Sequence, residues 1–427
     1  MWWLKVIFSL FAVLLTESMA RKSYRGYQVV RTEKLESQKD ITELIEFVET
    51  GPSSNAFDFG VTPRTVGCTA TIMVSPGSLS TLQEFLKEKG IESEVIMEDV
   101  GETLMKENNN NKLLRRIKDP KFVIDWNSYF GISDIHTFMD QIAEGKEDYV
   151  RVVTYGTSYE GRHLKLLKIA KAGVGAPNIF IEGGIHAREW ISPAVTTYII
   201  RSLLEEPQNS KYLDMFNFHI IPSANPDGYE FTRNDTRFWR KTRSYNPNSN
   251  CRGVDPNRNW GFHWHESGVS DDPCSAIYPG TEPFSEAEVE AIRKYTLSLN
   301  PTPIMSICIH SAAELFLIPY GYAVGAFPDN FDEMEELAEK AAKALNAVHG
   351  SEFGVINAAA FWPGAGAADD WYTGVLGSRF VYTIELRKGA GNIFDLPEDQ
   401  ITPSGEELWQ GMKVLLAGAH KATIEEK

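Results

Sequence analysis

The stretch Asn178-Ile-Phe-Ile-Glu-Gly-Gly-Ile-His186-Ala-Arg-Glu189-Trp190 decides the fold and the chemistry of this chain. The apolar run Ile179–Ile181 predicts a strand, and the glycines after it predict a turn at a sheet edge. Ser306-Ile-Cys-Ile-His310 repeats this design, because an apolar strand again delivers a histidine. Two histidine nitrogens and one glutamate oxygen satisfy Zn²⁺ and leave its fourth position open for water. The sequence therefore predicts a catalytic zinc site rather than a structural one.

A His-x-x-Glu pair alone is weak evidence, since most such pairs in long chains are solvated or belong to a core. The placement of His186 after a strand and glycines, and the second histidine at the end of a strand, favour a metal site. The histidines are 124 positions apart (310 − 186), so only the fold can bring them together.

The composition is that of a folded globular protein with an acidic surface. The 427 residues are too many for one typical domain, and 43% are hydrophobic and 23% charged. The formal charge is −16 and the pI about 5.1, which argue against binding to nucleic acid or to anionic membranes.

The N-terminus, residues 1–20, predicts a secretory signal peptide. Lys5 supplies a positive charge, Val6–Leu15 an apolar core and Ser18-Met-Ala20 a small-x-small cleavage site. The alternative, a membrane anchor, is disfavoured because the apolar run is short for a bilayer. No later stretch is long and apolar enough to span, so we expect an exported, extracellular, soluble protein without a membrane partner.

Export permits disulfides among the four cysteines. Cys251 and Cys274 flank a loop rich in Gly, Asn, Asp and Trp, and closing that loop would contribute roughly 3 kcal/mol. Cys308 lies in an apolar strand and is expected to be a buried thiol, and Cys68 lies in a different unit. A Cys68–Cys308 bridge stays open as an alternative.

Composition divides the rest of the chain into three parts. Residues 21–107 predict a small α+β open sandwich, with strands expected at 24–31, 70–74 and 94–100 and helices at 41–50 and 79–89. Residues 108–124 begin with four asparagines and form a linker, in which Arg115-Arg116 offers trypsin-like proteases a cleavage site; a plain solvated linker is the alternative.

Residues 125–427 alternate strands and helices, which predicts an α/β sheet covered on both faces. Its strands are expected at 149–154, 164–169, 178–181, 216–221, 304–309 and 380–386. The order suggests a secreted zymogen.

The helix that follows the metal motif is expected over 193–206, with Ser192 as its N-cap and Pro193 in its first turn.

Further residues would complete a zinc hydrolase. Glu385, at the end of the apolar strand that includes Tyr382, could take a proton from a zinc-bound water and pass it to a leaving amine. A simple ion pair between Glu385 and Arg387 is the alternative. Asn257 and Arg258 could clamp a carboxylate, because a guanidinium is a planar fork. Read alone, each of these residues is more often structural.

These motifs together resemble the secreted pancreatic-type zinc metallocarboxypeptidases of the A/B group in their preproenzyme form. The resemblance covers nearly all of the chain after Ala20. The motifs that carry it, in the family's order, are His186-Ala-Arg-Glu189-Trp190, Asn225-Pro-Asp-Gly-Tyr229, Asp255-Pro-Asn-Arg-Asn-Trp260, Ile309-His310-Ser311, Pro319-Tyr-Gly-Tyr322 and Thr383-Ile-Glu-Leu-Arg387. It implies a mixed, twisted, eight-stranded sheet with helices on both faces, preceded by the small prosegment.

The resemblance also implies a role for each site residue. One Zn²⁺ would be bound by His186, Glu189 and His310. Glu385 would act as general base and acid, and Arg240 would stabilise the oxyanion, an effect of roughly 3–4 kcal/mol. Peptide substrates would be held by Arg188, Asn257, Arg258, Ser311, Trp362 and Phe394, with Asn257 and Arg258 on the terminal carboxylate. Cys251 and Cys274 would form the family disulfide, and the prosegment would cover the cleft until cleavage near Arg116.

By resemblance, Asp369 occupies the floor of the specificity pocket, where A-type enzymes have an apolar residue and B-type enzymes an aspartate. A buried aspartate would form a charge-assisted pair with Lys or Arg, so we expect B-type cleavage. The alternatives are that Asp369 is solvated or that Asp370 takes its place, and A-type specificity for aromatic or aliphatic C-termini then remains. Two departures concern the substrate cap: Trp362 replaces a mobile tyrosine, and Ala312 replaces another.

Three other hypotheses remain at this point. A secreted peptide-binding homologue with little turnover is suggested by Trp362 and Ala312. An endopeptidase is opposed by the Asn257-Arg258 clamp, because internal peptide bonds have no terminal carboxylate. The sequon Asn234-Asp-Thr236 makes glycosylation a hypothesis, which its closeness to Arg240 disfavours. Monomer is the default oligomeric state.

Overall fold

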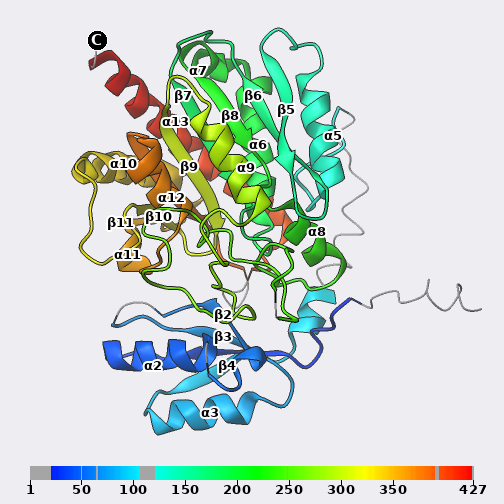
Figure 1. Cartoon of the computed structure of the whole chain (residues 1–427), viewed down its shortest axis with the longest axis vertical. Helices are drawn as coiled ribbons and strands as arrows, with labels where there is room; N and C mark the ends of the chain where they lie inside the picture. The colour runs from blue at the N-terminus through cyan, green and yellow to red at the C-terminus, as the bar shows by residue number, and fades with distance from the viewer. Residues whose placement is uncertain are drawn as a thin grey trace, which may run out of the picture.

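Two units stacked on each other make up the chain, as the computed structural model in Figure 1 shows. It describes residues 21–49, 51–63, 66–105, 121–247, 249–389 and 394–425. The predicted signal peptide and the Arg115-Arg116 cleavage site lie outside these ranges. The domain boundaries 1–20, 21–107, 108–124 and 125–427 therefore remain predictions.

The large unit is built on a mixed eight-stranded sheet, as expected. In spatial order its strands are β11 (Gly354–Asn357), β10 (Leu315–Ile318), β12 (Phe380–Leu386), β9 (Pro303–Ser311), β7 (Asn178–Gly183), β8 (Asn217–Ile221), β6 (His163–Ile169) and β5 (Val150–Thr157). The central four, β12-β9-β7-β8, are parallel, and their neighbours β10 and β6 pair antiparallel to them. Their near-continuous apolar sequences match a sheet that is buried on both faces.

Helices cover both faces of this sheet. One face packs against α5 (Ile132–Ala143), α6 (Ile191–Glu205), α10 (Phe331–His349) and α13 (Ile401–Glu425). The other packs against α9 (Ala287–Leu297), α12 (Ala368–Trp371) and the turn Tyr372–Leu376. Alternation along β9 sends Ile307 and Ile309 to the first face and Cys308 to the second. Short helices α7 (Ser210–Met215), α8 (Pro226–Asn234) and α11 (Ala358–Phe361) complete the unit.

Two expectations about the large unit need correction. The predicted N-cap Ser192 lies inside α6, which begins at Ile191; its hydroxyl donates to the Ile309 carbonyl and accepts from the Gly184 amide. The edge strand β11 and its neighbour β10 were not expected. Each has four residues, too few to show a period by which a strand could be recognised.

The small unit is a four-stranded antiparallel sheet with two helices on one face. Its strands lie in the order β2 (Phe57–Val61), β3 (Thr71–Val74), β1 (Gln28–Thr32) and β4 (Ser93–Met97), and its helices are α2 (Gln38–Glu49) and α3 (Leu79–Glu88). The strand β2 is an addition to the expected set. The uncovered face of this sheet points to the large unit, with Val29 and Met73 packed near Phe238.

The cysteines behave as expected. Cys251 and Cys274 form a disulfide, Cys308 is a buried thiol and Cys68 is an exposed one, which rules out the alternative Cys68–Cys308 bridge. Within the described ranges, none of the helices has both the length and the apolar composition to cross a membrane.

Candidate metal centre and active site

Strand pairing places two site residues side by side. His310 on β9 and Glu385 on β12 are register partners in a parallel pair, so their side chains leave the same face at the carboxyl ends of the strands. His186 comes from the turn after β7, where Gly184 has φ +67°, and a Cβ there would approach Pro193 Cγ to 2.9 Å. The turn therefore needs glycine, as the sequence pattern suggested.

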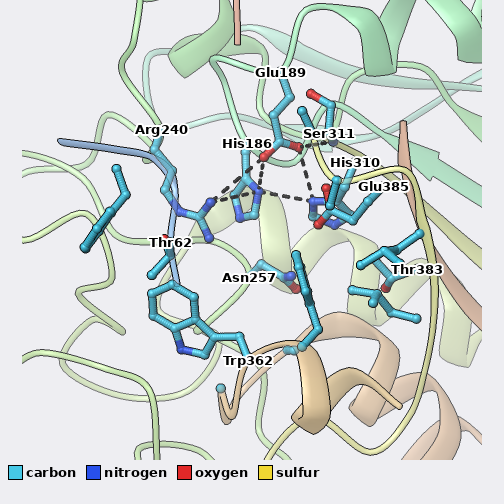
Figure 2. Close-up of a pocket in the computed structure, with 18 of the residues that line it drawn as sticks. Thr62, His186, Glu189, Arg240, Asn257, His310, Ser311, Trp362, Thr383 and Glu385 are labelled. Atoms are coloured by element: carbon cyan, nitrogen blue, oxygen red, sulfur yellow. Dashed lines mark hydrogen bonds and ion pairs between the residues drawn. The ribbon is translucent and has the colours of Figure 1, made fainter. Parts of the chain in front are cut away.

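His186, Glu189 and His310 converge as a candidate metal site (Figure 2). One ligand atom from each lies within 4.8 Å of the others, and all three side chains are buried. His186 Nδ1 lies 2.7 Å from Glu189 Oε1 and 3.1 Å from His310 Nδ1, and His310 Nδ1 lies 3.2 Å from Glu189 Oε2. Ser311 donates its amide to Glu189 Oε2 at 3.2 Å, which helps to fix that carboxylate.

The charge balance of this cluster fits a cation. Burial opposes charge on Glu189, but His186 and His310 hold the pKa of its carboxyl below the usual range. Burial likewise opposes charge on His310, yet Glu189 raises the pKa of His310 to about 9. The cluster therefore favours a positive charge beside this carboxylate, which a bound metal ion would supply. Two imidazole nitrogens and one carboxylate oxygen are the donor set of an open zinc site.

Asp255 orients the first histidine from behind. Its Oδ1 lies 3.2 Å from His186 Nε2, which directs Nδ1 of the same ring to the cluster. Asp255 Oδ2 accepts from Arg240 Nε at 3.0 Å and from Nη2 at 2.9 Å. Burial raises the pKa of Asp255, but Arg240 and His186 outweigh it and keep that pKa well below its usual range. Arg240 is thereby held with Nη1 at 3.2 Å from His186 Nδ1, facing the cluster.

A cleft of about 270 Å³ opens beside the cluster and collects most of the predicted substrate residues. Besides the three metal-site residues, its lining includes Arg188, Arg240, Asn257, Arg258, Ser311, Ala312, Trp362, Asp369, Glu385 and Phe394. Figure 2 shows Asn257 and Trp362 across the cleft from the His–Glu–His cluster, with Glu385 next to His310. Asn257 Oδ1 accepts from the Ala368 amide at 2.9 Å, which leaves its NH₂ group directed away from that contact.

The Glu385–Arg387 ion pair considered above does not form. Both ends of the Arg387 guanidinium bond to Glu407, at 2.5 and 2.9 Å, and Nη1 donates to Gln400. The charge of Glu385 instead faces His310 and Arg240.

Asp369 and Asp370 have different surroundings. Asp369 lines the cleft and is buried, so it is not solvated; its Oδ2 accepts from Thr383 Oγ1 at 2.9 Å. Asp370 accepts from the amides of Gly321 and Tyr322, at 2.7 and 2.9 Å, and so ties the loop below the cleft. Burial and the charge of Asp369 raise the pKa of Asp370 well above its usual value.

The small unit reaches into the same cleft. Glu49, Phe59, Gly60, Val61 and Thr62 all contribute to its lining. Asp58 accepts two hydrogen bonds from Arg188 Nη1, at 3.0 and 2.9 Å, while Arg188 stacks on the ring of Phe394 with its guanidinium carbon 4.1 Å from the centroid. Burial raises the pKa of Glu49 to about 7, with the charge of Asp58 acting in the same direction.

Reasoning from the sequence missed several of these partners. The orienting role of Asp255 was not predicted, although an aspartate two residues before the Asn257-Arg258 pair was a usable signal. Asp58 and Glu49 carried no local signal, because only the docking of the two units brings them to the site.

Comparisons with known proteins agree with this geometry. Residues 135–411 match the family described as zinc carboxypeptidase, and residues 34–107 match the carboxypeptidase activation peptide. The chain is 43% identical over 295 residues to a carboxypeptidase B of Astacus astacus, which covers 68% of this chain and 97% of that protein. It is 36% identical over 422 residues to zinc carboxypeptidase A 1 of Anopheles gambiae, covering 97% and 94%.

Solved structures give the same picture. The carboxypeptidase A from Helicoverpa armigera superposes with a TM-score of 0.85 at 26% identity, covering 93% of this chain and 98% of that one. The thrombin activatable fibrinolysis inhibitor superposes with a TM-score of 0.81, also at 26% identity, covering 93% and 100%. Relatives named A and B both occur, so the names leave the side-chain preference open.

Proposed function

This chain belongs to the zinc carboxypeptidase family, and we propose that it is a secreted zymogen which, once cut, removes C-terminal Lys or Arg from peptides. The metallocarboxypeptidase class follows from the family, whereas the basic preference, the export and the site of cleavage are our proposal. The export rests on the signal-like sequence of residues 1–20.

The proposed chemistry assigns each residue of the cleft a task. A Zn²⁺ held by His186, Glu189 and His310 would supply a Lewis acid and lower the pKa of a bound water. Glu385 would accept the proton from the attacking water and later donate it to the leaving amine. Arg240, fixed by two hydrogen bonds to Asp255, would stabilise the negative charge that develops on the carbonyl oxygen.

Action at the C-terminus is supported by Asn257 and Arg258. Both line the cleft, and Arg258 is held by bonds from Nε to the Gly268 carbonyl and from Nη1 to the Asn257 carbonyl. A guanidinium held in this way would meet a terminal carboxylate with little loss of side-chain entropy. Internal peptide bonds offer no such anion, so we favour an exopeptidase over an endopeptidase.

Asp369 is the observation that carries the basic preference. This buried carboxylate lines the cleft, and among the described residues it accepts hydrogen bonds from two neutral donors, Thr383 Oγ1 and the Asp370 amide. A Lys or Arg side chain of the substrate would provide the missing counter-ion. Leu315 and Leu317, which also line the cleft, would pack against its aliphatic part.

The zymogen proposal rests on the small unit. Its strand β2 and the end of α2 occupy the cleft, and the Asp58–Arg188 pair fastens it there. Release would require cutting in the segment that follows, and we propose Arg115-Arg116 as the site for a trypsin-like protease. Peptides with a free C-terminus would be the substrates.

Trypsin-treated protein tested on acyl dipeptides ending in Arg, Lys, Phe or Leu decides between these proposals. We expect zinc-dependent release of Arg and Lys, at least tenfold faster than of Leu. Release of Phe or Leu alone would replace the B-type proposal by an A-type one. No release from any substrate would favour a peptide-binding homologue, which the Trp362 and Ala312 departures suggest.

A further inference from the structure

We propose that Glu182 is a second acidic determinant of the side-chain pocket, lying behind Asp369 and strengthening the preference for a cationic C-terminal residue. This inference rests on the Lys/Arg preference proposed above. Glu182 does not line the cleft, so it would act on the bound cation through its charge and not by contact.

Strand register places Glu182 in one row with the pocket. Glu182 on β7 pairs with Cys308 on β9, and Cys308 pairs with Thr383 on β12, in parallel ladders. Register partners in such ladders point to the same face. Two residues further along these strands, His310 and Glu385 form the catalytic row on that same face, roughly 7 Å away at the strand rise. The row that contains Glu182 therefore lies next to the row of His310 and Glu385 on the same face of the sheet.

Side-chain contacts continue this row to Asp369. Thr383 lines the cleft and donates to Asp369 Oδ2 at 2.9 Å. The Cys308 thiol lies between Thr383 and Glu182 and is exposed to the charges of both carboxylates. Tyr372 donates its hydroxyl to Glu182 Oε2 at 2.7 Å, whereas Glu182 Oε1 is buried and accepts no hydrogen bond from the described residues.

The two carboxyl groups share a niche in which the cationic groups His310 and Arg258 act on them without forming an ion pair with either. Among the described residues, neither Glu182 nor Asp369 forms an ion pair with Lys or Arg, and their charges repel each other. The titratable groups that face Glu182 are Tyr372, His310, Cys308, Asp369 and Tyr155, of which only His310 can be cationic. A Lys or Arg side chain entering beside Asp369 would relieve this repulsion.

The protonation state of Glu182 follows from its burial. Burial raises the pKa of Glu182 to about 7. Below pH 7 the carboxyl is therefore mostly neutral and adds little to the attraction of a cation, and above pH 7 it is mostly charged and adds more. A bound cation lowers the pKa of Glu182, so the group releases its proton to solvent when the substrate enters.

The test is the selectivity ratio, kcat/KM for an acyl dipeptide ending in Arg divided by that for its Leu counterpart, measured from pH 6 to 8.5. Both substrates use the same metal centre and the same Glu385, so their titrations cancel in the ratio. For the wild type we expect the ratio to rise on the order of tenfold across this range. For Glu182→Gln we expect a flat ratio, about tenfold lower at pH 8.5.

Matched variants separate charge from packing. Glu182→Asp keeps a carboxylate and should restore the rise, which a purely structural role would not do. Glu288→Gln removes another buried carboxyl, whose pKa burial also raises to about 7, and should leave the rise unchanged. Zinc content of each variant confirms that the site is intact.

If the wild type favours Arg and Glu182→Gln keeps the same selectivity ratio and the same pH dependence, this inference alone is overturned. A wild type without any preference for Arg would overturn the proposed specificity, and this inference with it.

Discussion

The pairing of β12 with β9 sets the side chain of Glu385, the proposed general base, next to His310. Arg387 comes directly after Leu386, the last residue of β12, and its guanidinium binds Glu407. The base is kept near the metal cluster and Arg240 without being neutralised by its neighbour in sequence.

Replacing this base should abolish turnover while leaving the protein folded. For Glu385→Gln in the trypsin-treated enzyme, we expect kcat/KM to fall by about 10²–10⁴-fold, since the amide cannot accept the proton of the attacking water. Steady-state hydrolysis of a C-terminal Arg substrate gives the value, and replacement of Glu339, an exposed glutamate on α10, in Glu339→Gln serves as a matched control. Activity within threefold of wild type would remove Glu385 from the mechanism.

Site residues differ in how far their sequence predicts them. His186, Glu189 and His310 follow strands and glycines, so strand ends could be recognised and their convergence expected. The role proposed for Glu182 cannot be predicted in this way, because the residue simply ends an apolar run. Only its register with Cys308 and Thr383 shows which residues its side chain faces. Register depends on long-range pairing, which one sequence does not specify.

At the scale of elements, the small sheet presents a row of three residues to the large unit. Val29, Met73 and Asp58 are register partners across β1, β3 and β2. The first two pack with Phe238, and Asp58 pairs with Arg188. One row therefore supplies both the apolar contact and the ion pair that hold the prosegment over the cleft.

Removing the ion pair should loosen the prosegment. For Asp58→Asn we expect the isolated prosegment to inhibit the mature enzyme about tenfold less strongly, because Arg188 is buried and loses its charged partner. Inhibition constants measured with added prosegment report this directly. Asp40→Asn, in the first turn of α2, is the control, and equal inhibition by Asp58→Asn and wild type would refute the anchoring role.

The disulfide should matter at the same scale. Cys251 and Cys274, which are 23 positions apart, close a loop that contains the Asn257-Arg258 segment. Replacing both with serine should cost roughly 3 kcal/mol of unfolding free energy and lower the Tm by several degrees. Calorimetry gives the shift, and Cys68→Ser, which replaces an exposed thiol outside the disulfide, should leave Tm unchanged. A double variant as stable as wild type would contradict the prediction.

Element prediction succeeded where strands were long and failed where they were short. The strand Phe380–Leu386 has the expected bounds, and the other expected strands of the large sheet differ from the observed ones by one to three residues at one or both ends. The strand β10 pairs with β12, and β11 pairs with β10. A four-residue apolar run in the sequence is too short to predict such pairing. Ser192 does not cap α6, because its hydroxyl accepts from the Gly184 amide after β7 and donates to the Ile309 carbonyl on β9.

At the scale of the whole molecule, the two units meet over the active cleft. The small unit fills part of a cavity whose remaining walls carry the candidate metal cluster, the proposed carboxylate clamp and the proposed side-chain pocket. The prosegment and the proposed substrate therefore use one surface.

The metal content of the purified chain tests this account most directly. Elemental mass spectrometry should find one zinc per wild-type chain and one per Glu385→Gln chain, but less than a tenth of that in His186→Ala and His310→Ala, each folded by circular dichroism. Zinc retained at full occupancy in both histidine variants would contradict the central claim that these side chains bind the catalytic metal.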